Sequence, residues 1–143
     1  MESVYSQVMK FKRKYPRTVT HHRLKKHSRI VEQHLNPGEV VNYVFAAQKN
    51  ATPGDFFETC VVAITNERML IGQKRVMFGY FLNSITPEMY NDMQVRSSLF
   101  WGSVTIDTVK EMVDLSNIDK RALPEIETAV TSFMMEAKKK YGK

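Results

Sequence analysis

Two apolar segments separated by a tight turn constrain the fold of this chain more than any other feature. Residues 60–64 (CVVAI) and 69–71 (MLI) flank a turn at Asn66-Glu67. Short β-branched and aliphatic runs bounded by turn residues are typical of buried strands. Asn tolerates the left-handed backbone that a two-residue hairpin turn needs. Residues 59–75 are therefore predicted to form a central β-hairpin.

Five further segments have strand-like composition. They are residues 40–47, 76–82 with a bend at Gly79, 93–96, 104–107 and 112–115. Several short strands joined by close turns are typical of a sandwich or barrel. The sequence therefore predicts about seven strands.

Helical periodicity precedes these strands. Residues 2–15 are predicted to form a first helix that Pro16 ends, and Thr18 or Thr20 can cap a second helix that ends at residues 36–38. The apolar positions are Val4, Val8, Phe11 and Tyr15 in the first helix, and Leu24, Ile30, Val31 and Leu35 in the second. We expect a helical hairpin that docks on the sheet through these stripes.

One amphipathic helix is predicted after the last strand. Pro124 suits a first helical position, and Glu125 suits the positive end of the helix dipole. A single apolar stripe is formed by Ile126, Val130, Phe133, Ala137 and Tyr141. We therefore expect this helix to belong to the core.

The turn Thr65-Asn66-Glu67-Arg68 lies between two apolar strands. It resembles the central hairpin of the bacterial pleckstrin-homology (PH-like) domains, which typically reads apolar strand, T-N-[KE]-R, apolar strand. The resemblance covers roughly residues 36–141. It implies an α+β fold, a seven-stranded antiparallel barrel closed by a C-terminal helix. The expected division is a basic helical hairpin at 1–36 and the PH-like barrel with its helix at 37–143.

Catalytic motifs are missing from the sequence. It contains no GxGxxG, GxxxxGK[ST], GxSxG, CxxC or HExxH. We therefore expect a non-enzymatic protein without a cofactor. The single cysteine, Cys60, falls in a predicted buried strand, which favours a reducing, cytoplasmic location. No apolar run approaches the ~20 residues of a membrane helix, and no secretory signal is recognisable.

Four histidines, all within the first 34 residues, raise the question of a metal site. His27 and His34 are seven residues apart, about 10 Å along a helix, which is too far to share one ion. His21 and His22 are adjacent and point apart. We expect polar histidines on a surface helix and no metal.

Basic residues are concentrated at the N-terminus. Residues 1–38 carry nine Lys and Arg against two acids, a net charge of +7, whereas the remainder has 12 against 13, a net charge of −1. The nine are candidate polyanion-binding residues: Lys10, Lys12, Arg13, Lys14, Arg17, Arg23, Lys25, Lys26 and Arg29. Either they are solvated helix faces, or they attract an acidic membrane or nucleic acid.

Aromatic residues at two turns are the candidates for an interaction surface on the barrel. They are Phe56, Phe57, Phe100 and Trp101. Such side chains either fold back on the core or mark a contact with a partner or a membrane. Eukaryotic PH domains that bind phosphoinositides typically carry K-x-n-[KR]-x-R in the first hairpin, but residues 48–55 contain only Lys49 as a cation. Phosphoinositide binding by that route is not expected.

These observations favour a binding or scaffolding module. The first hypothesis is a contact with an unknown protein or with another copy of the chain, through the barrel or its edge strand. The alternative is peripheral binding to an acidic membrane surface through the basic helices. Nucleic-acid association ranks last, because aromatic residues interleaved for base stacking are missing from the basic segment.

Overall fold

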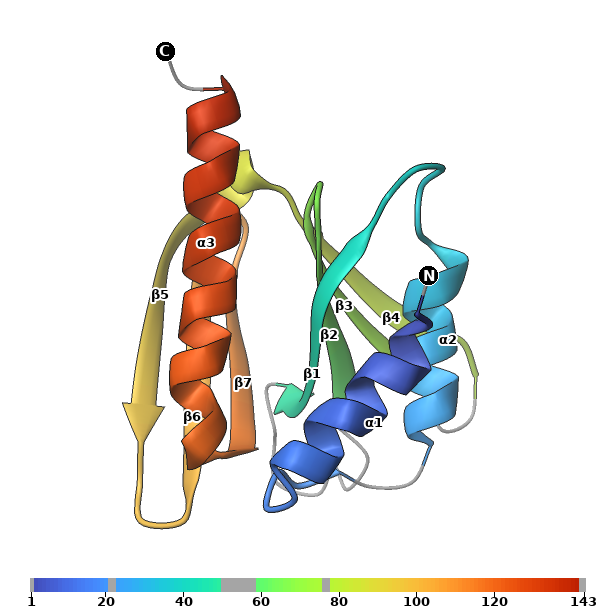
Figure 1. Ribbon diagram of the computed structural model, residues 1–143, viewed down its shortest axis with the longest axis vertical. Helices are drawn as coiled ribbons and strands as arrows, with labels where there is room; N and C mark the ends of the chain where they lie inside the picture. Colours follow the sequence, from blue (N-terminus) through green and yellow to red (C-terminus); the bar gives the residue numbers. More distant parts are fainter. Residues whose placement is uncertain (1, 21–22, 50–58, 76–77, 142–143) are drawn as a thin grey trace.

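The computed structural model describes residues 2–20, 23–49, 59–75 and 78–141. Within them a seven-stranded antiparallel sheet curls into a half-barrel (Figure 1). The helices are α1 (Val4–Lys14), α2 (Leu24–Gln33) and α3 (Leu123–Tyr141), with single 3-10 turns η1 (Pro87–Met89) and η2 (Lys120–Ala122). The strands are β1 (Val41–Lys49), β2 (Thr59–Thr65), β3 (Met69–Lys74), β4 (Tyr80–Ile85), β5 (Tyr90–Ser97), β6 (Trp101–Thr108) and β7 (Met112–Asp119). The predicted fold class is confirmed.

The sheet has two limbs that meet at the end of β1. Its strand order is β4-β3-β2-β1-β7-β6-β5, so β4 and β5 are the two edges, and η1 connects them along the chain. Within the described residues β1 pairs with β7 only through Gln48–Ser116 and Lys49–Leu115. Along the rest of β1 the two limbs separate.

β2 contains the most apolar run in the sequence, and both of its faces are buried. Its side chains alternate between two cores: the inner core, to which α3 contributes, and the outer core, to which α1 and α2 contribute. Cys60, Val62 and Ile64 lie in the inner core, and Val61 and Ala63 lie in the outer core. A strand covered on both faces reads as a continuous apolar run rather than an alternating one. The central hairpin is thus confirmed, and Cys60 is buried.

α1 contributes to both cores. Val4 and Val8 pack outside the sheet together with Val31 of α2, as the apolar stripes predict. Phe11 and Tyr15, at the end of the same stripe, belong instead to the inner core. The Phe11 ring lies 6.1 Å from the ring of Phe45 on β1. The end of α1 therefore fills space between the separated limbs.

The turn between β2 and β3 differs from the expected geometry. Asn66 does not adopt a positive φ, so its predicted left-handed conformation is wrong. The Thr65 hydroxyl instead accepts hydrogen bonds from the backbone N–H groups of Glu67 and Arg68, both at 3.0 Å. The Asn66 side chain accepts a hydrogen bond from the Val40 N–H at 2.8 Å. A side-chain-closed turn of this kind needs no left-handed residue.

Arg68, the last residue of the turn motif, is a structural cross-link. Its guanidinium forms two hydrogen bonds of 3.0 Å to the two oxygens of Glu39, whose side chain is fully buried. It also donates to the carbonyl of His34 at 2.7 Å and to the Ser84 hydroxyl at 3.1 Å. The motif therefore ties the end of α2 to β3 and β4.

Two predicted element boundaries are wrong. α2 begins at Leu24 with Arg23 as its N-cap, at a φ of 87° and without a side-chain cap, so neither Thr18 nor Thr20 caps it. β4 begins at Tyr80, after a turn in which Gly79 has a φ of 72°, so no strand bends at Gly79. Part of the predicted 76–82 segment lies outside the described residues.

α3 is part of the inner core, as expected. Ile126, Val130, Met134 and Ala137 are buried. Phe133 belongs to the predicted apolar stripe but is only half-buried. The neighbouring Met134 is buried in the core, where Phe133 is expected. The side chain of Tyr141 lies outside the described part.

Candidate functional site

One end of the molecule gathers most of the predicted site residues. The segment between α1 and α2, the β3–β4 turn and the β5–β6 turn all lie at this end, which is lowest in Figure 1. We call it the loop end. The α1–α2 segment crosses it, since the Val19 N–H donates to the Asn117 carbonyl at 2.8 Å and the Arg23 guanidinium donates to the Arg75 carbonyl at 3.2 Å.

Asp119 fixes this crossing segment. Its buried carboxylate accepts hydrogen bonds from the Arg121 side chain and from the Arg17 N–H, and its own N–H donates to the Thr18 hydroxyl. The hydrogen bonds from the Arg121 guanidinium are the main cause that lowers the pKa of Asp119 to about 2. The negative charge of Asp119 is therefore balanced by the positive charge of Arg121.

The β5–β6 turn projects apolar side chains from the loop end. Leu99 is 75% exposed, Phe100 57% and Trp101 38%. The Trp101 indole N–H donates to the carbonyl of Arg17 at 2.9 Å, and its ring lies 5.7 Å from that of Phe100. The aromatic pair is therefore held against the basic segment rather than folded into the core.

A second group of aromatic residues surrounds the β3–β4 turn, and the sequence analysis did not single it out. Phe78 is 81% exposed and Phe81 45%. The cations of Lys49 and Arg75 lie 5.5 and 4.9 Å from the centre of the Phe81 ring, within the range of cation–π attraction. The sequence analysis predicts one strand over residues 76–82, so it assigns Phe78 and Phe81 to a strand and not to a turn. Gly79, between two aromatic residues, is the sequence signal for the turn. Phe56 and Phe57 lie outside the described residues.

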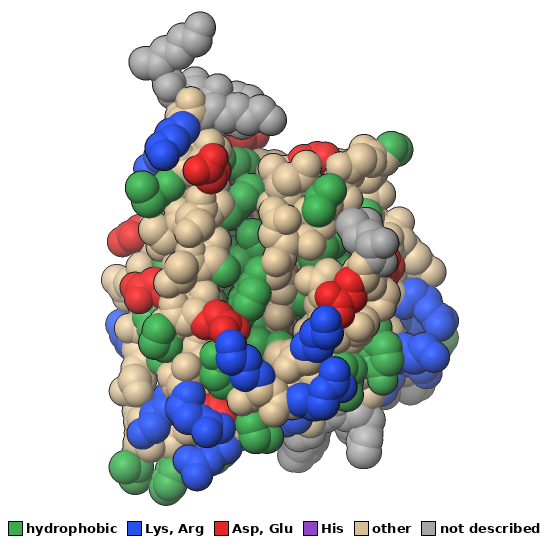
Figure 2. Space-filling model, in the orientation of Figure 1, with side chains coloured by type: hydrophobic (Ala, Val, Ile, Leu, Met, Phe, Trp, Pro, Cys, Tyr) green, Lys and Arg blue, Asp and Glu red, His purple; other side chains and the backbone are tan. Residues whose placement is uncertain are grey.

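The nine basic candidates divide by their contacts. Lys12 donates to the carbonyls of Pro16 and Thr18, and Lys10 and Lys14 form ion pairs with Glu2 and Glu125. Among the residues that the structure describes, the exposed members that form no side-chain hydrogen bond or ion pair are Arg13, Arg17, Lys25, Lys26 and Arg29. Figure 2 shows Lys and Arg side chains gathered toward the loop end, beside hydrophobic side chains at its tip.

His27 corrects the expectation of surface histidines. It is only 2% exposed, and its Nδ1 accepts a hydrogen bond from the Lys74 N–H at 2.8 Å. Burial, and secondarily the charge of Arg23, lower the pKa of His27 to about 4. His27 is therefore a neutral acceptor that joins α2 to the end of β3. His21 and His22 lie outside the described residues.

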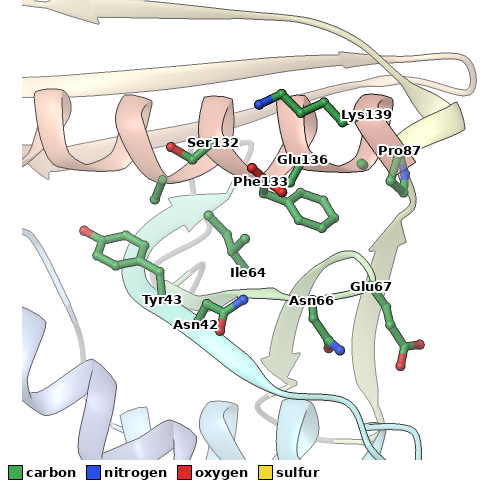
Figure 3. A pocket seen from close by; sticks show the side chains of 12 residues that line it. Asn42, Tyr43, Ile64, Asn66, Glu67, Pro87, Ser132, Phe133, Glu136 and Lys139 are labelled. Atoms are coloured by element: carbon green, nitrogen blue, oxygen red, sulfur yellow. The ribbon is translucent and has the colours of Figure 1, made fainter. Parts of the chain in front are cut away.

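A groove opens between α3 and the β1–β2 limb, away from the loop end (Figure 3). Its volume is about 740 Å³. Phe133 and Ile64 point into it from opposite walls, Tyr43 closes one side, and Glu136 and Lys139 stand on the helix rim. The Tyr43 hydroxyl donates to Glu125 at 2.7 Å, and burial with this bond raises the pKa of Tyr43, which suits a structural phenol rather than an acid–base catalyst.

The sequence profile described as "Bacterial PH domain" matches residues 35–132, more than half of the chain. The chain belongs to the bacterial PH domain family. A solved structure described as a pleckstrin homology domain from Shewanella amazonensis SB2B has a TM-score of 0.50 and 12% identity, and the match covers 81% of this chain and 91% of that one. At this identity the likeness supports the fold alone. A search of curated proteins finds no match to this chain.

PH domains generally serve as non-catalytic binding modules, and no enzymatic family is indicated for this one. In this bacterial PH domain, the β1–β2 loop (residues 50–58), in which eukaryotic relatives carry their phosphoinositide motif, lies outside the described residues. Among the residues that are described, no three His, Cys, Asp or Glu side chains are grouped so as to hold a metal ion. None of the described helices is long and apolar enough to cross a membrane.

Proposed function

We propose that this PH domain binds acidic membrane surfaces peripherally, with its loop end facing the lipid. One observation carries the proposal: exposed cations and exposed apolar side chains meet at the same end of the fold. Apart from Arg121, which is paired with Asp119, the exposed cations on the segments of this end are Arg13, Arg17, Lys25, Lys26, Arg75 and Lys120. Basic side chains close to an anionic bilayer each contribute about 1 kcal/mol of attraction.

The apolar side chains supply the second part of an interfacial contact. Phe100 and Phe78 project from two turns, and Trp101 lies between the turn tip and the basic segment. Aromatic residues are favoured at the level of the lipid headgroups, where the ring is apolar on one side and meets water on the other. The two acidic side chains that contact the crossing segment, Asp119 and Glu125, are paired with Arg121 and Lys14. Repulsion of an anionic surface is thereby reduced.

The test is vesicle co-sedimentation with the full chain. We expect binding to phosphatidylcholine vesicles that contain phosphatidylserine, weaker binding at high salt, and little binding without the acidic lipid. The double variant Arg13→Glu with Arg17→Glu should lose most of this binding. Lys110→Glu, a charge reversal on the β6–β7 turn at the opposite end, is the control and should change it little.

The apolar contribution has its own matched pair. Both Phe100 and Met112 have side chains that are 57% exposed, but Met112 lies at the start of β7, at the end opposite the loop end. Phe100→Ala should therefore weaken binding, whereas Met112→Ala should not. The emission of Trp101 should shift to the blue on binding. No binding to acidic vesicles, or equal losses from the variants at both ends, would contradict the proposal.

A protein contact or self-association is the second candidate function. The observation that favours it is the exposed edge of β5, which a further strand can extend. This surface is separate from the loop end, so both activities are compatible in one domain.

A further inference from the structure

β5 is an edge strand whose outer side is open. It pairs with β6 on one side, and the sheet order of the described chain places no strand on the other (Figure 1). Such an edge presents unpaired backbone N–H and C=O groups that can pair with another strand. β4 is the other edge of the described sheet, and there the side chains of Tyr80 and Asn83 are hydrogen-bonded to His34 and Glu111.

The side chains of β5 form two distinct faces. Asp92, Gln94 and Arg96 are exposed on the outer face, while Met93 and Val95 are half-buried on the face that meets the inner core. Pairing with β6 is regular from Asp92 to the end of the strand, after one irregularity next to Tyr90. A six-residue segment with regular pairing, residues 92–97, is therefore available for pairing on its outer side.

We propose that β5 pairs antiparallel with β5 of a second copy, about a two-fold axis at Gln94. In an antiparallel pair, directly opposed residues point to the same face of the sheet. A two-fold axis perpendicular to the sheet must therefore pass through a residue position and not between two residues. Centred on Gln94, the ladder sets Asp92 opposite Arg96 of the second copy, twice, and Met93 opposite Val95, twice. Opposite charges and apolar pairs are the stabilising cross-strand combinations.

The neighbouring registers are less favourable. A centre at Met93 or Val95 would leave Asp92 and Arg96 opposite uncharged residues. A centre at Asp92 or Arg96 would set like charges against each other, which is destabilising. Gln94 is thus the one centre along this segment that satisfies both charges.

The charges of the single copy support the same arrangement. On the sheet, Asp92 lies directly opposite Asp107 of β6, so two acids face each other. Within the described chain neither acid has a salt bridge, and the side-chain contact of Arg96 is a long 3.5 Å hydrogen bond to Gln94. Asp92 and Arg96 of one strand are about 13 Å apart and cannot meet. Arg96 of the second copy would lie beside the two acids.

Sedimentation of the full chain over a concentration series tests the dimer. We expect reversible dimers, and Arg96→Asp should raise the dissociation constant at least about tenfold because two attractive pairs become repulsive. The double variant Asp92→Arg with Arg96→Asp restores complementarity and should restore the dimer. Lys110→Glu is the control for a change of net charge.

Cross-linking tests the register. Opposed residues of an antiparallel pair have Cα atoms about 4.5–5.5 Å apart, which a disulfide can span. Gln94→Cys should therefore form a covalent dimer on mild oxidation, whereas Thr105→Cys, on the same face one strand inward, should not. The native Cys60 is buried and supplies no background.

Each negative outcome overturns the inference. A chain that stays monomeric, a dimer that survives Arg96→Asp, or a monomer whose β5 captures a strand of another protein would each show that β5 does not pair with itself. None of these results affects vesicle binding by the loop end, so the two proposals fail separately.

Discussion

Acidification should loosen the contact between α2 and the sheet through His27. In the neutral ring Nδ1 accepts the Lys74 N–H, so a proton added there would set two donors against each other in a buried space. The nearby charge of Arg23 opposes protonation further. The folded state therefore resists a proton that the unfolded chain accepts readily.

The pKa of His27 sets the size and sign of this effect. It falls from 6.5 to about 4 on folding, so the stabilisation is present above pH 6.5 and is lost as the pH falls toward 4. Each unit of pH in that window corresponds to about 1.4 kcal/mol. Between pH 7.5 and pH 5 the free energy of unfolding should therefore decrease by about 2 kcal/mol through His27 alone.

Urea denaturation of the wild type and of His27→Asn at several pH values measures this loss. Asn places an acceptor oxygen close to the position of Nδ1 but does not titrate. The variant should be less stable at pH 7.5, because it fills the site less well. The difference between the two proteins should shrink by about 2 kcal/mol at pH 5. All carboxylates are common to both proteins, so their titration cancels.

A constant difference between wild type and variant over this range would refute the reasoning. So would a direct titration of the His27 ring by NMR that placed its midpoint close to the ordinary value of 6.5 rather than near 4.

Three further substitutions test the packing by thermal or urea unfolding. Ile126→Ala, at a fully buried position of α3, should lower the free energy of unfolding by about 2–5 kcal/mol. Phe133→Ala should lower it less, because that ring is only half-buried in the groove wall, and equal losses would contradict this difference. Gly72→Ala should cost about 1–3 kcal/mol, since its Cβ would lie 2.7 Å from Val31 of α2, and an unchanged stability would mean that α2 is not held there. Arg68→Ala should cost about 3–5 kcal/mol by leaving Glu39 buried without its partner, and adding Glu39→Gln should recover part of the loss.

The parts of the fold that the sequence predicts correctly are encoded locally. The central hairpin and α3 follow from runs and stripes of neighbouring residues, and the turn motif identifies the family before any contact is known. The sequence leaves open whether Phe100 folds back on the core, and the structure shows it exposed at the turn tip, while its role in binding stays a prediction.

The parts that the sequence does not predict depend on distant partners. His27 is polar, and the sequence therefore predicts a surface position. In the structure it is buried, because the backbone N–H of Lys74, 47 positions away, donates a hydrogen bond to its ring. Phe11 continues the stripe of Val4 and Val8, yet it enters a different core because β1 and β7 separate beside it. The β5 edge has an ordinary sequence, and it becomes a candidate contact only when the sheet order places no described strand beyond it.

The two proposed surfaces together lead to one further prediction. β5 runs toward the loop end, because the β5–β6 turn follows its last residue (Figure 1). Antiparallel pairing of two β5 strands therefore points the two loop ends in opposite directions. Such a dimer cannot lay both basic ends on one flat bilayer, so at concentrations that support the dimer it should connect two acidic vesicles and increase their light scattering. Arg96→Asp should still bind single vesicles but should no longer connect them, and the charge-swapped double variant, with the net charge of the wild type, should connect them again. Binding to vesicles without any clustering by the dimeric wild type would show that the loop end and the β5 edge do not act together as described.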